Sequence, residues 1–190
     1  MEGVVSHAHI DRRSARTRSR LERAHLALIH ARGYDAINVQ DICAAAGVSR
    51  SAFYAHYADK DDLKRSGLGG LRRDLEVAQR ASNGAPFAFT HLLFRHAREH
   101  LNLYRGLGDG DGRAVALGAI RDMLESLARR EFVAEGSPEL REANVQMTVG
   151  ACLTLLTWWL DNGCKQLTSD EINAAFHRLV AHGAPATAPR

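Results

Sequence analysis

The 190-residue sequence predicts an all-α protein, with an N-terminal three-helix domain followed by a larger helical domain. Three observations support this. Apolar residues recur at three- and four-residue spacing along most of the chain, and no stretch shows the alternation of a half-buried strand. Glycine and proline clusters separate the helical stretches. Residues 38–57 have the pattern of a helix-turn-helix, which is two short helices joined by a tight turn, here at Gly47.

The first helix is expected over residues 13–32, with Gly33 ending it. His25 lies on its apolar face with Leu21 and Ile29, so we expect His25 to pack in the core. Residues 12–23, around the start of this helix, contain six arginines opposed only by Glu22: Arg12, Arg13, Arg16, Arg18, Arg20 and Arg23. A charge run is usually a solvated helix face, but beside a helix-turn-helix it favours contact with phosphates.

The helix-turn-helix can be justified residue by residue. Asn38 is a good N-cap for a helix over residues 39–46, and Asp41 places a carboxylate in its first turn. Gly47 has the backbone freedom to leave that helix, and Ser49 can cap a second helix over residues 50–56. A short, exposed, polar helix is what the major groove of DNA accepts.

Later helices follow from the same signals. Asp59 is expected to cap a helix from Lys60 that is weakened by glycines at positions 67, 69 and 70. The remaining helices are expected over residues 87–103, 114–132, 138–161 and 169–182. The glycine-rich run 106–112 resembles a calcium loop only at its start, because the later ligands are absent. It is therefore predicted to be a flexible connector.

The helix expected over residues 138–161 is apolar nearly all round from Val145 onward. Such a helix must be covered on two sides. In a small domain, the protein's own core can cover one side and a second copy of the chain the other. The sequence therefore predicts a homodimer formed through about residues 140–161 and 169–182.

Motifs spread over residues 13–68 resemble the DNA-binding domain of TetR-family transcriptional regulators. They are Gly33-Tyr34-Asp35-Ala36, Val39-x-Asp41-Ile42, Ala46-Gly47-Val48-Ser49, Phe53-Tyr54-x-His56-Tyr57 and Lys60-x-x-Leu63. Asn38 and Cys43 depart from the Thr and Ala that are commonest in the family, but Asn also caps helices and Cys tolerates burial. The last two expected helices resemble the family more weakly.

The resemblance implies a DNA-binding domain at residues 13–68, with its helix-turn-helix at about 38–57, and a regulatory and dimerisation domain at 69–183. Residues 1–12 and 184–190 are expected to be disordered tails. The resemblance further implies a homodimer that binds a palindromic double-stranded operator, acts as a repressor and is released from the DNA by a small-molecule effector.

Matched position by position, the family's DNA contacts correspond to Gln40, Ser49, Arg50, Ser51, Tyr54, His56, Tyr57 and Lys60. Arg50 is suited to reading guanine, whereas Tyr54 and Lys60 are expected to hold phosphates. His56 and Tyr57 are as well suited to packing the domain together.

The family also implies a ligand pocket in the larger domain. Its candidate lining residues are Phe94, Tyr104, Met123, Met147 and Trp158, although each would serve equally as an ordinary core residue. The alternative is a DNA-binding protein of the same fold that is controlled by a protein partner, or by a metal or redox signal. The sequence does not specify the effector.

Metal, redox and enzymatic functions have weaker support. His96 and His100 share a helical face and His91 lies nearby, but no third ligand follows, so no metal or cofactor is predicted. Cys43, Cys152 and Cys164 have no metal-ligand spacing and are predicted to be inert thiols, with a redox role for Cys164 as the alternative. No nucleophile and base set or phosphate loop is present, so an enzyme is not predicted.

No run of 18 apolar residues and no export signal are found. The expected location is therefore the cytoplasm, without a membrane partner.

Overall fold

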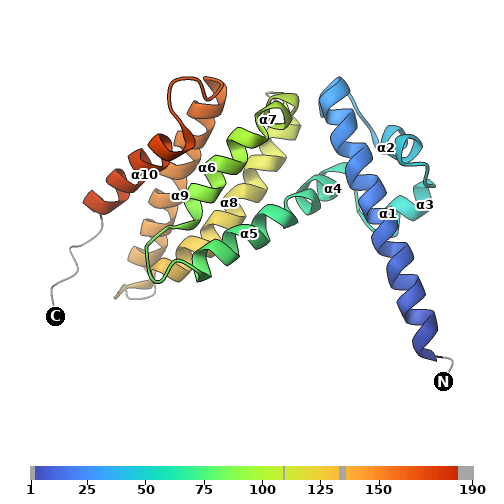
Figure 1. The fold of residues 1–190 in the computed structure, drawn as a ribbon, viewed down its shortest axis with the longest axis horizontal. Coiled ribbons are helices and arrows are strands. Elements are labelled where there is room, and N and C mark those ends of the chain that lie inside the picture. Colours follow the sequence, from blue (N-terminus) through green and yellow to red (C-terminus); the bar gives the residue numbers. More distant parts are fainter. Residues whose placement is uncertain (1–2, 109, 133–135, 184–190) are drawn as a thin grey trace. The chain divides into compact units, whose positions relative to one another are not determined.

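The computed structural model describes residues 3–108, 110–132 and 136–183, and within these ranges the chain forms α-helices joined by turns (Figure 1). It divides into two compact units. The first comprises Met1–Leu68 and Asn102–Ala116, and the second Gly69–Leu101 and Leu117–Arg190. The expected division at residue 68 did not foresee that residues 102–116 pack with the N-terminal part of the chain.

The first unit contains α1 (Gly3–Arg32), α2 (Val39–Ala46), α3 (Arg50–Tyr54), α4 (Lys60–Gly67), most of α7 (Leu101–Gly106) and the start of α8 (Asp111–Glu131). Helix α1 begins ten residues before its expected start, so residues 3–12 are helical where a disordered tail was expected. No proline or glycine follows Gly3 in this stretch, and nothing in it stops the helix. The other expected tail, 184–190, lies outside the described residues.

The expected caps of the helix-turn-helix are confirmed. The Asp41 backbone N–H donates to the Asn38 side chain at 3.0 Å, and the Asn38 backbone N–H donates to the Asp41 carboxylate at 2.9 Å. This reciprocal pair satisfies backbone donors that would otherwise be unpaired at the start of α2. Gly47 ends α2 with a φ of 60°, and Ser49 caps α3 by accepting from the Ala52 N–H at 3.2 Å.

Two apolar clusters hold the first unit together. Leu21 of α1, Ile42 of α2, Phe53 of α3 and Leu63 of α4 are fully buried members of the cluster beneath the helix-turn-helix. The second cluster joins the end of α1 to residues far along the chain: Ile29, Tyr34, Ile37, Leu107 and Ala116.

The second cluster depends on the glycine-rich run, which is docked rather than a free connector as expected. The Tyr34 N–H donates to the Gly106 carbonyl at 3.1 Å, and the Gly112 N–H donates to the Asp35 carboxylate at 3.3 Å. A Cβ on Gly112 would lie 2.5 Å from the Tyr34 ring, and one on Gly106 would lie 3.1 Å from Ile29. The glycines therefore allow close packing against α1 and the turn that follows it.

His25 is buried in the first unit, as expected, and is only 2% exposed. Its Nε2 atom has no hydrogen-bond partner among the described residues. Burial, and then the nearby positive charges of Lys64 and Lys60, lower the His25 pKa to about 4. Lys64 is also buried, and this desolvation lowers its pKa to about 8.

The second unit is built from α5 (Gly69–Arg80), α6 (Phe89–Glu99), most of α8, α9 (Pro138–Asp161) and α10 (Ser169–Gly183). Helix α6 contacts α5, α9 and α10. Its Phe94 meets Trp159 of α9 and Phe176 of α10, with ring centroids 6.0 and 6.5 Å apart. Within the described ranges, no helix has an apolar stretch long enough to cross a bilayer.

Replacing Gly112 with Ala should destabilise the protein. Although Ala favours a helix by about 1 kcal/mol over Gly, the new Cβ would collide with the buried Tyr34 ring. We expect a net loss of about 1–3 kcal/mol in the free energy of unfolding, measured with urea. Gly118→Ala in the same helix is the matched control, because its Cβ would meet no atom within 4 Å. A gain in stability from both substitutions would contradict the docking of this segment.

The stability should fall as the pH drops from 6.5 to 4. In this window the unfolded state binds a proton at His25 that the folded state, with its pKa of about 4, refuses. The loss attributable to this group approaches about 3 kcal/mol at pH 4. Urea unfolding at several pH values should therefore give a shallower pH dependence for His25→Leu than for the natural chain. Equal slopes would show that His25 is not the titrating group.

Candidate nucleic-acid interface

Helices α2 and α3 present a polar surface around the turn at Gly47. Gln40, Ser49, Arg50, Ser51 and Tyr54 are exposed, and Tyr54 is 51% accessible despite its aromatic ring. The Tyr54 ring packs edge-on against the buried Phe53, with centroids 5.4 Å apart. Its hydroxyl end is thus available to a partner, while its ring is held by the core.

The residues at the start of α3 differ in their freedom. The Ser49 hydroxyl caps the helix and lies 2.9 Å from the Ser51 hydroxyl, so both have local partners. Among the described residues, no hydrogen bond or ion pair holds the Arg50 side chain, which is exposed to solvent. Arg50 therefore has the donors and the reach for a base edge.

Tyr57 and His56 are less accessible than the other predicted contacts. Tyr57 is buried, its hydroxyl donates to Glu22 at 3.3 Å, and burial raises its pKa. The His56 ring is half-buried beside it, with centroids 6.3 Å apart. For Tyr57, the structure gives a packing role that joins α1 to the end of α3.

The Lys60 side chain is hydrogen-bonded within the first unit. Its ammonium group donates to the carbonyls of Tyr34 at 3.2 Å and Ile37 at 3.1 Å. It also lies 4.4 Å from the centroid of the Tyr34 ring, and the Tyr34 hydroxyl donates to Asp61. These contacts fix the turn before α2, a structural role that the sequence pattern did not reveal.

A basic concavity of about 500 Å³ lies between α1 and the turn of the helix-turn-helix. Its walls come from one face of α1 and from the turn with the start of α3: Arg13, Arg16, Thr17, Arg20, Gly47, Val48, Ser49 and Ala52. The sequence predicted a basic arm, but it did not indicate which arginines face the helix-turn-helix.

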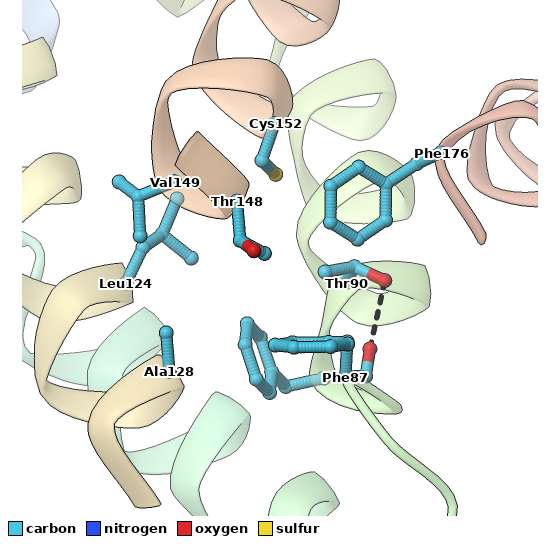
Figure 2. A pocket seen from close by; sticks show the side chains of 9 residues that line it. Phe87, Thr90, Leu124, Ala128, Thr148, Val149, Cys152 and Phe176 are labelled. Atoms are coloured by element: carbon cyan, nitrogen blue, oxygen red, sulfur yellow. Dashed lines mark hydrogen bonds between the residues drawn. The ribbon is translucent and has the colours of Figure 1, made fainter. Parts of the chain in front are cut away.

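The second unit contains a small apolar cavity between α6, α8, α9 and α10, shown in Figure 2. Its volume of about 10 Å³ is room for roughly one water molecule. The lining residues are Phe87, Phe89, Thr90, Leu124, Ala128, Thr148, Val149, Cys152 and Phe176.

The five residues predicted to line a pocket do not gather around this cavity. Phe94 and Met123 are buried in the core, whereas Met147 is 64% and Trp158 44% exposed. Tyr104 belongs to the first unit, where its buried hydroxyl has no partner among the described residues. Helical periodicity placed these residues on apolar faces, but it could not distinguish a cavity from packed core or open surface.

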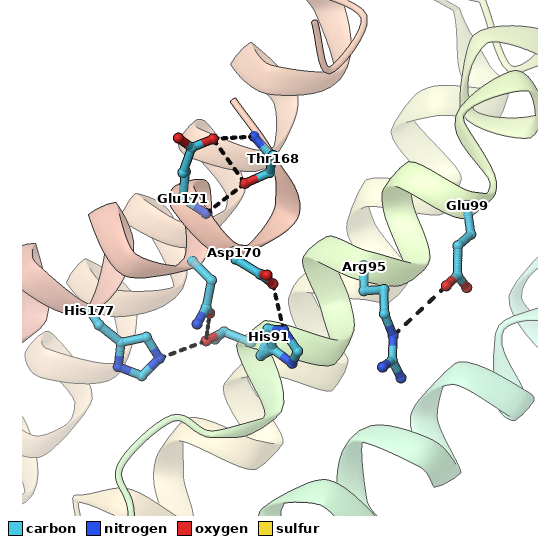
Figure 3. Close-up of polar contacts among 9 residues, drawn as sticks. His91, Arg95, Glu99, Thr168, Asp170, Glu171 and His177 are labelled. Carbon is cyan, nitrogen blue, oxygen red and sulfur yellow. Dashed lines mark hydrogen bonds and ion pairs between the residues drawn. The ribbon is translucent and has the colours of Figure 1, made fainter. Parts of the chain in front are cut away.

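Polar contacts join α6 to α10 (Figure 3). His91 Nε2 lies 2.8 Å from an Asp170 carboxylate oxygen. The Thr90 hydroxyl lies 2.7 Å from the Asn173 side chain and 3.2 Å from His177 Nε2. These groups satisfy one another across the helix pair.

The histidines and cysteines offer little chemistry. His96 and His100 face each other with ring centroids 4.3 Å apart, but the described residues include no cluster of three His, Cys, Asp or Glu side chains suited to a metal ion. Cys43, Cys152 and Cys164 are buried, and burial raises the Cys152 pKa to about 12.

Helices α9 and α10 expose large apolar side chains, namely Leu140, Met147 and Trp158 on α9 and Leu179 on α10. On α9, Leu140, Met147 and Trp158 are spaced by seven and eleven residues, which keeps them near one face of the helix. This face is not covered by the chain's own core.

Known proteins resemble the first unit in sequence. Residues 23–65 match the family model described as bacterial regulatory proteins, tetR family. The N-terminal domain is therefore similar to the DNA-binding domains of the tetR family. The uncharacterized HTH-type transcriptional regulator YxbF of Bacillus subtilis is 42% identical over 55 residues, which are 28% of this chain and 14% of YxbF. The TetR relationship at the level of sequence thus lies in the DNA-binding domain.

Solved structures extend the TetR-family likeness to the whole fold. A TetR transcriptional regulator from Streptococcus agalactiae has a TM-score of 0.62 at 23% identity, covering 91% of this chain and 98% of its own. NalD of Pseudomonas aeruginosa, the secondary repressor of the MexAB-OprM multidrug efflux pump, has a TM-score of 0.60 at 19% identity, with 87% and 96% covered. The chain therefore has the all-α fold of TetR-family regulators.

Lys60 is bonded within the domain whereas Tyr54 is exposed, so replacing each with Ala should change the free energy of unfolding by different amounts. Lys60→Ala removes two hydrogen bonds from an ammonium group to backbone carbonyls, so we expect a loss of about 2 kcal/mol in the free energy of unfolding. Tyr54→Ala removes an exposed side chain and should cost under about 1 kcal/mol. Urea unfolding distinguishes the two. If Lys60→Ala left the free energy of unfolding unchanged, the structural role would be wrong and Lys60 would be available for phosphate contact.

Proposed function

We propose that this TetR-family protein is a sequence-specific transcriptional repressor that binds a palindromic operator as a homodimer. The observation that carries the proposal is the exposed face of the helix-turn-helix, where the unpartnered Arg50 stands beside Ser51 and Tyr54. In this arrangement Arg50 reads a guanine, Tyr54 holds a phosphate, and Ser49 and Ser51 lie close to the bases. Gln40 adds a contact from α2.

The homodimer is proposed to form through α9 and α10. One recognition helix reads only a few base pairs, whereas a two-fold dimer sets two of them about 34–36 Å apart on one face of the DNA. The exposed Leu140, Met147, Trp158 and Leu179 supply an apolar surface for such an interface. A dimer bound at a promoter represses by occupancy alone, and NalD, which shares the fold, is a repressor.

An effector that releases the DNA is proposed to act on the second unit. The cavity lined by Phe87, Leu124 and Phe176 is apolar, so it favours a small hydrophobic molecule. With only about 10 Å³ of space, it must enlarge before a molecule bigger than water can enter. This small volume also favours a second candidate, in which a protein partner controls the same DNA-binding dimer.

Selection of bound duplexes from a random pool, at about 0.15 M salt to screen non-specific binding, tests the proposal. We expect a palindrome from the natural chain. Arg50→Ala should select an altered motif, with a loss of about 1–3 kcal/mol at the affected base pair, because the bidentate contact to guanine is gone. Tyr54→Ala should bind every sequence more weakly while selecting the same motif.

The two variants control for each other, since both change an exposed residue of α3. If Arg50→Ala loses equal affinity for the selected motif and for random DNA, the reading role of Arg50 is wrong. If the natural chain enriches no motif, sequence-specific binding itself is excluded under these conditions.

A further inference from the structure

The arginines of α1 fall on different faces of the helix, although the sequence presents them as one run. Arg13, Arg16, Thr17 and Arg20 line the basic concavity. Their spacing of three, four and seven residues puts them on one helical face, directed at the turn between α2 and α3. Arg18 is equally exposed, but it is not among the residues that line the concavity.

Arg20 ties this face to the helix-turn-helix. Its guanidinium donates to the Gly47 carbonyl at 3.0 Å. Gly47 has a φ of 60°, and a Cβ there would lie 2.7 Å from the same guanidinium nitrogen, so a side chain at this position would displace the arginine. A guanidinium has five N–H donors in a planar fork, and this bond uses one of them. The wall of the concavity is thus fixed to the turn that precedes the recognition helix.

The concavity combines three guanidinium groups with the hydroxyls of Thr17 and Ser49, and no acidic side chain lines it. The Thr17 hydroxyl donates to the Arg13 carbonyl of its own helix at 3.0 Å, so the arginines are the free donors of the site. Such a wall complements the phosphates of a nucleic-acid backbone, to which guanidinium groups bind with paired hydrogen bonds.

We propose that this concavity seats the phosphate backbone of double-stranded DNA beside the groove that α3 enters, with Arg13 and Arg16 as its phosphate-binding residues. The inference rests on the proposed function and assigns α1 a part in it. The Lys60 ammonium group is engaged within the domain, so the arginine face supplies positive charge that Lys60 does not offer freely. Because phosphates carry no sequence information, this contact adds affinity without specificity.

The test measures binding to a random-sequence duplex as a function of salt, using the full chain. Each phosphate neutralised by an arginine contributes about 0.9 to the slope of log K against log salt. Arg16→Ala should therefore reduce the slope by about 0.9 and weaken binding by up to about eightfold at 0.1 M salt. The double variant Arg13→Ala/Arg16→Ala should reduce the slope by about 1.8.

Arg18→Ala is the matched control, because it removes the same charge from the same helix two residues away, outside the concavity. It should leave the slope unchanged. Equal losses for Arg16→Ala and Arg18→Ala would reduce the effect to overall charge and overturn the proposal. So would an unchanged slope in the double variant, which would leave the concavity to an anionic partner other than DNA. If the natural chain binds no duplex at any salt concentration, the proposed function fails as well.

Discussion

The first unit depends on the packing around one residue, Tyr34. Its backbone N–H donates to Gly106, its carbonyl accepts from Lys60, and its hydroxyl donates to Asp61. Its ring lies beneath the Lys60 ammonium, near His25, and against the position where Gly112 has no side chain. One buried side chain thereby connects α1, α4 and the start of α8. These contacts lie in the same unit as the helix-turn-helix and stabilise the domain that presents it.

The elements set by local chemistry could be predicted from the sequence. Asn38, Ser49 and Asp59 cap the helices that they were expected to cap, because a capping side chain needs only the N–H groups of the next turn. The docking of Gly106 and Gly112 could not be predicted, since it depends on contacts with Tyr34 and Asp35, more than 70 residues earlier. A glycine-rich run looks the same in sequence whether it is flexible or closely packed.

The candidate sites also differ in whether they depend on local sequence or on distant contacts. Exposure of Arg50 and Tyr54 follows from the local pattern of a short helix with Phe53 on its buried side. The position of the cavity cannot be predicted in this way, because the sequence pattern of a buried helical face is the same whether the face meets a filled core or an empty space. Phe94 was expected at a pocket and packs against Trp159, while Phe87, which lies before α6, lines the cavity. The concavity at Arg13, Arg16 and Gly47 likewise needs two segments of chain that only folding brings together.

Helix α8 belongs to both units, since its residues up to Ala116 fall in the first and those from Leu117 onward in the second. Its first turns carry Gly112 and Ala116, which pack in the first unit, and later turns carry Leu124 and Ala128, which line the cavity of the second. A continuous helix transmits a shift along its axis because each turn is hydrogen-bonded to the next. Under the proposed function, an effector that prefers one arrangement by about 1–3 kcal/mol would change DNA binding five- to 150-fold. The cost expected for a Cβ at Gly112 is about 1–3 kcal/mol, which is of the same order as the preference that such an effector would need.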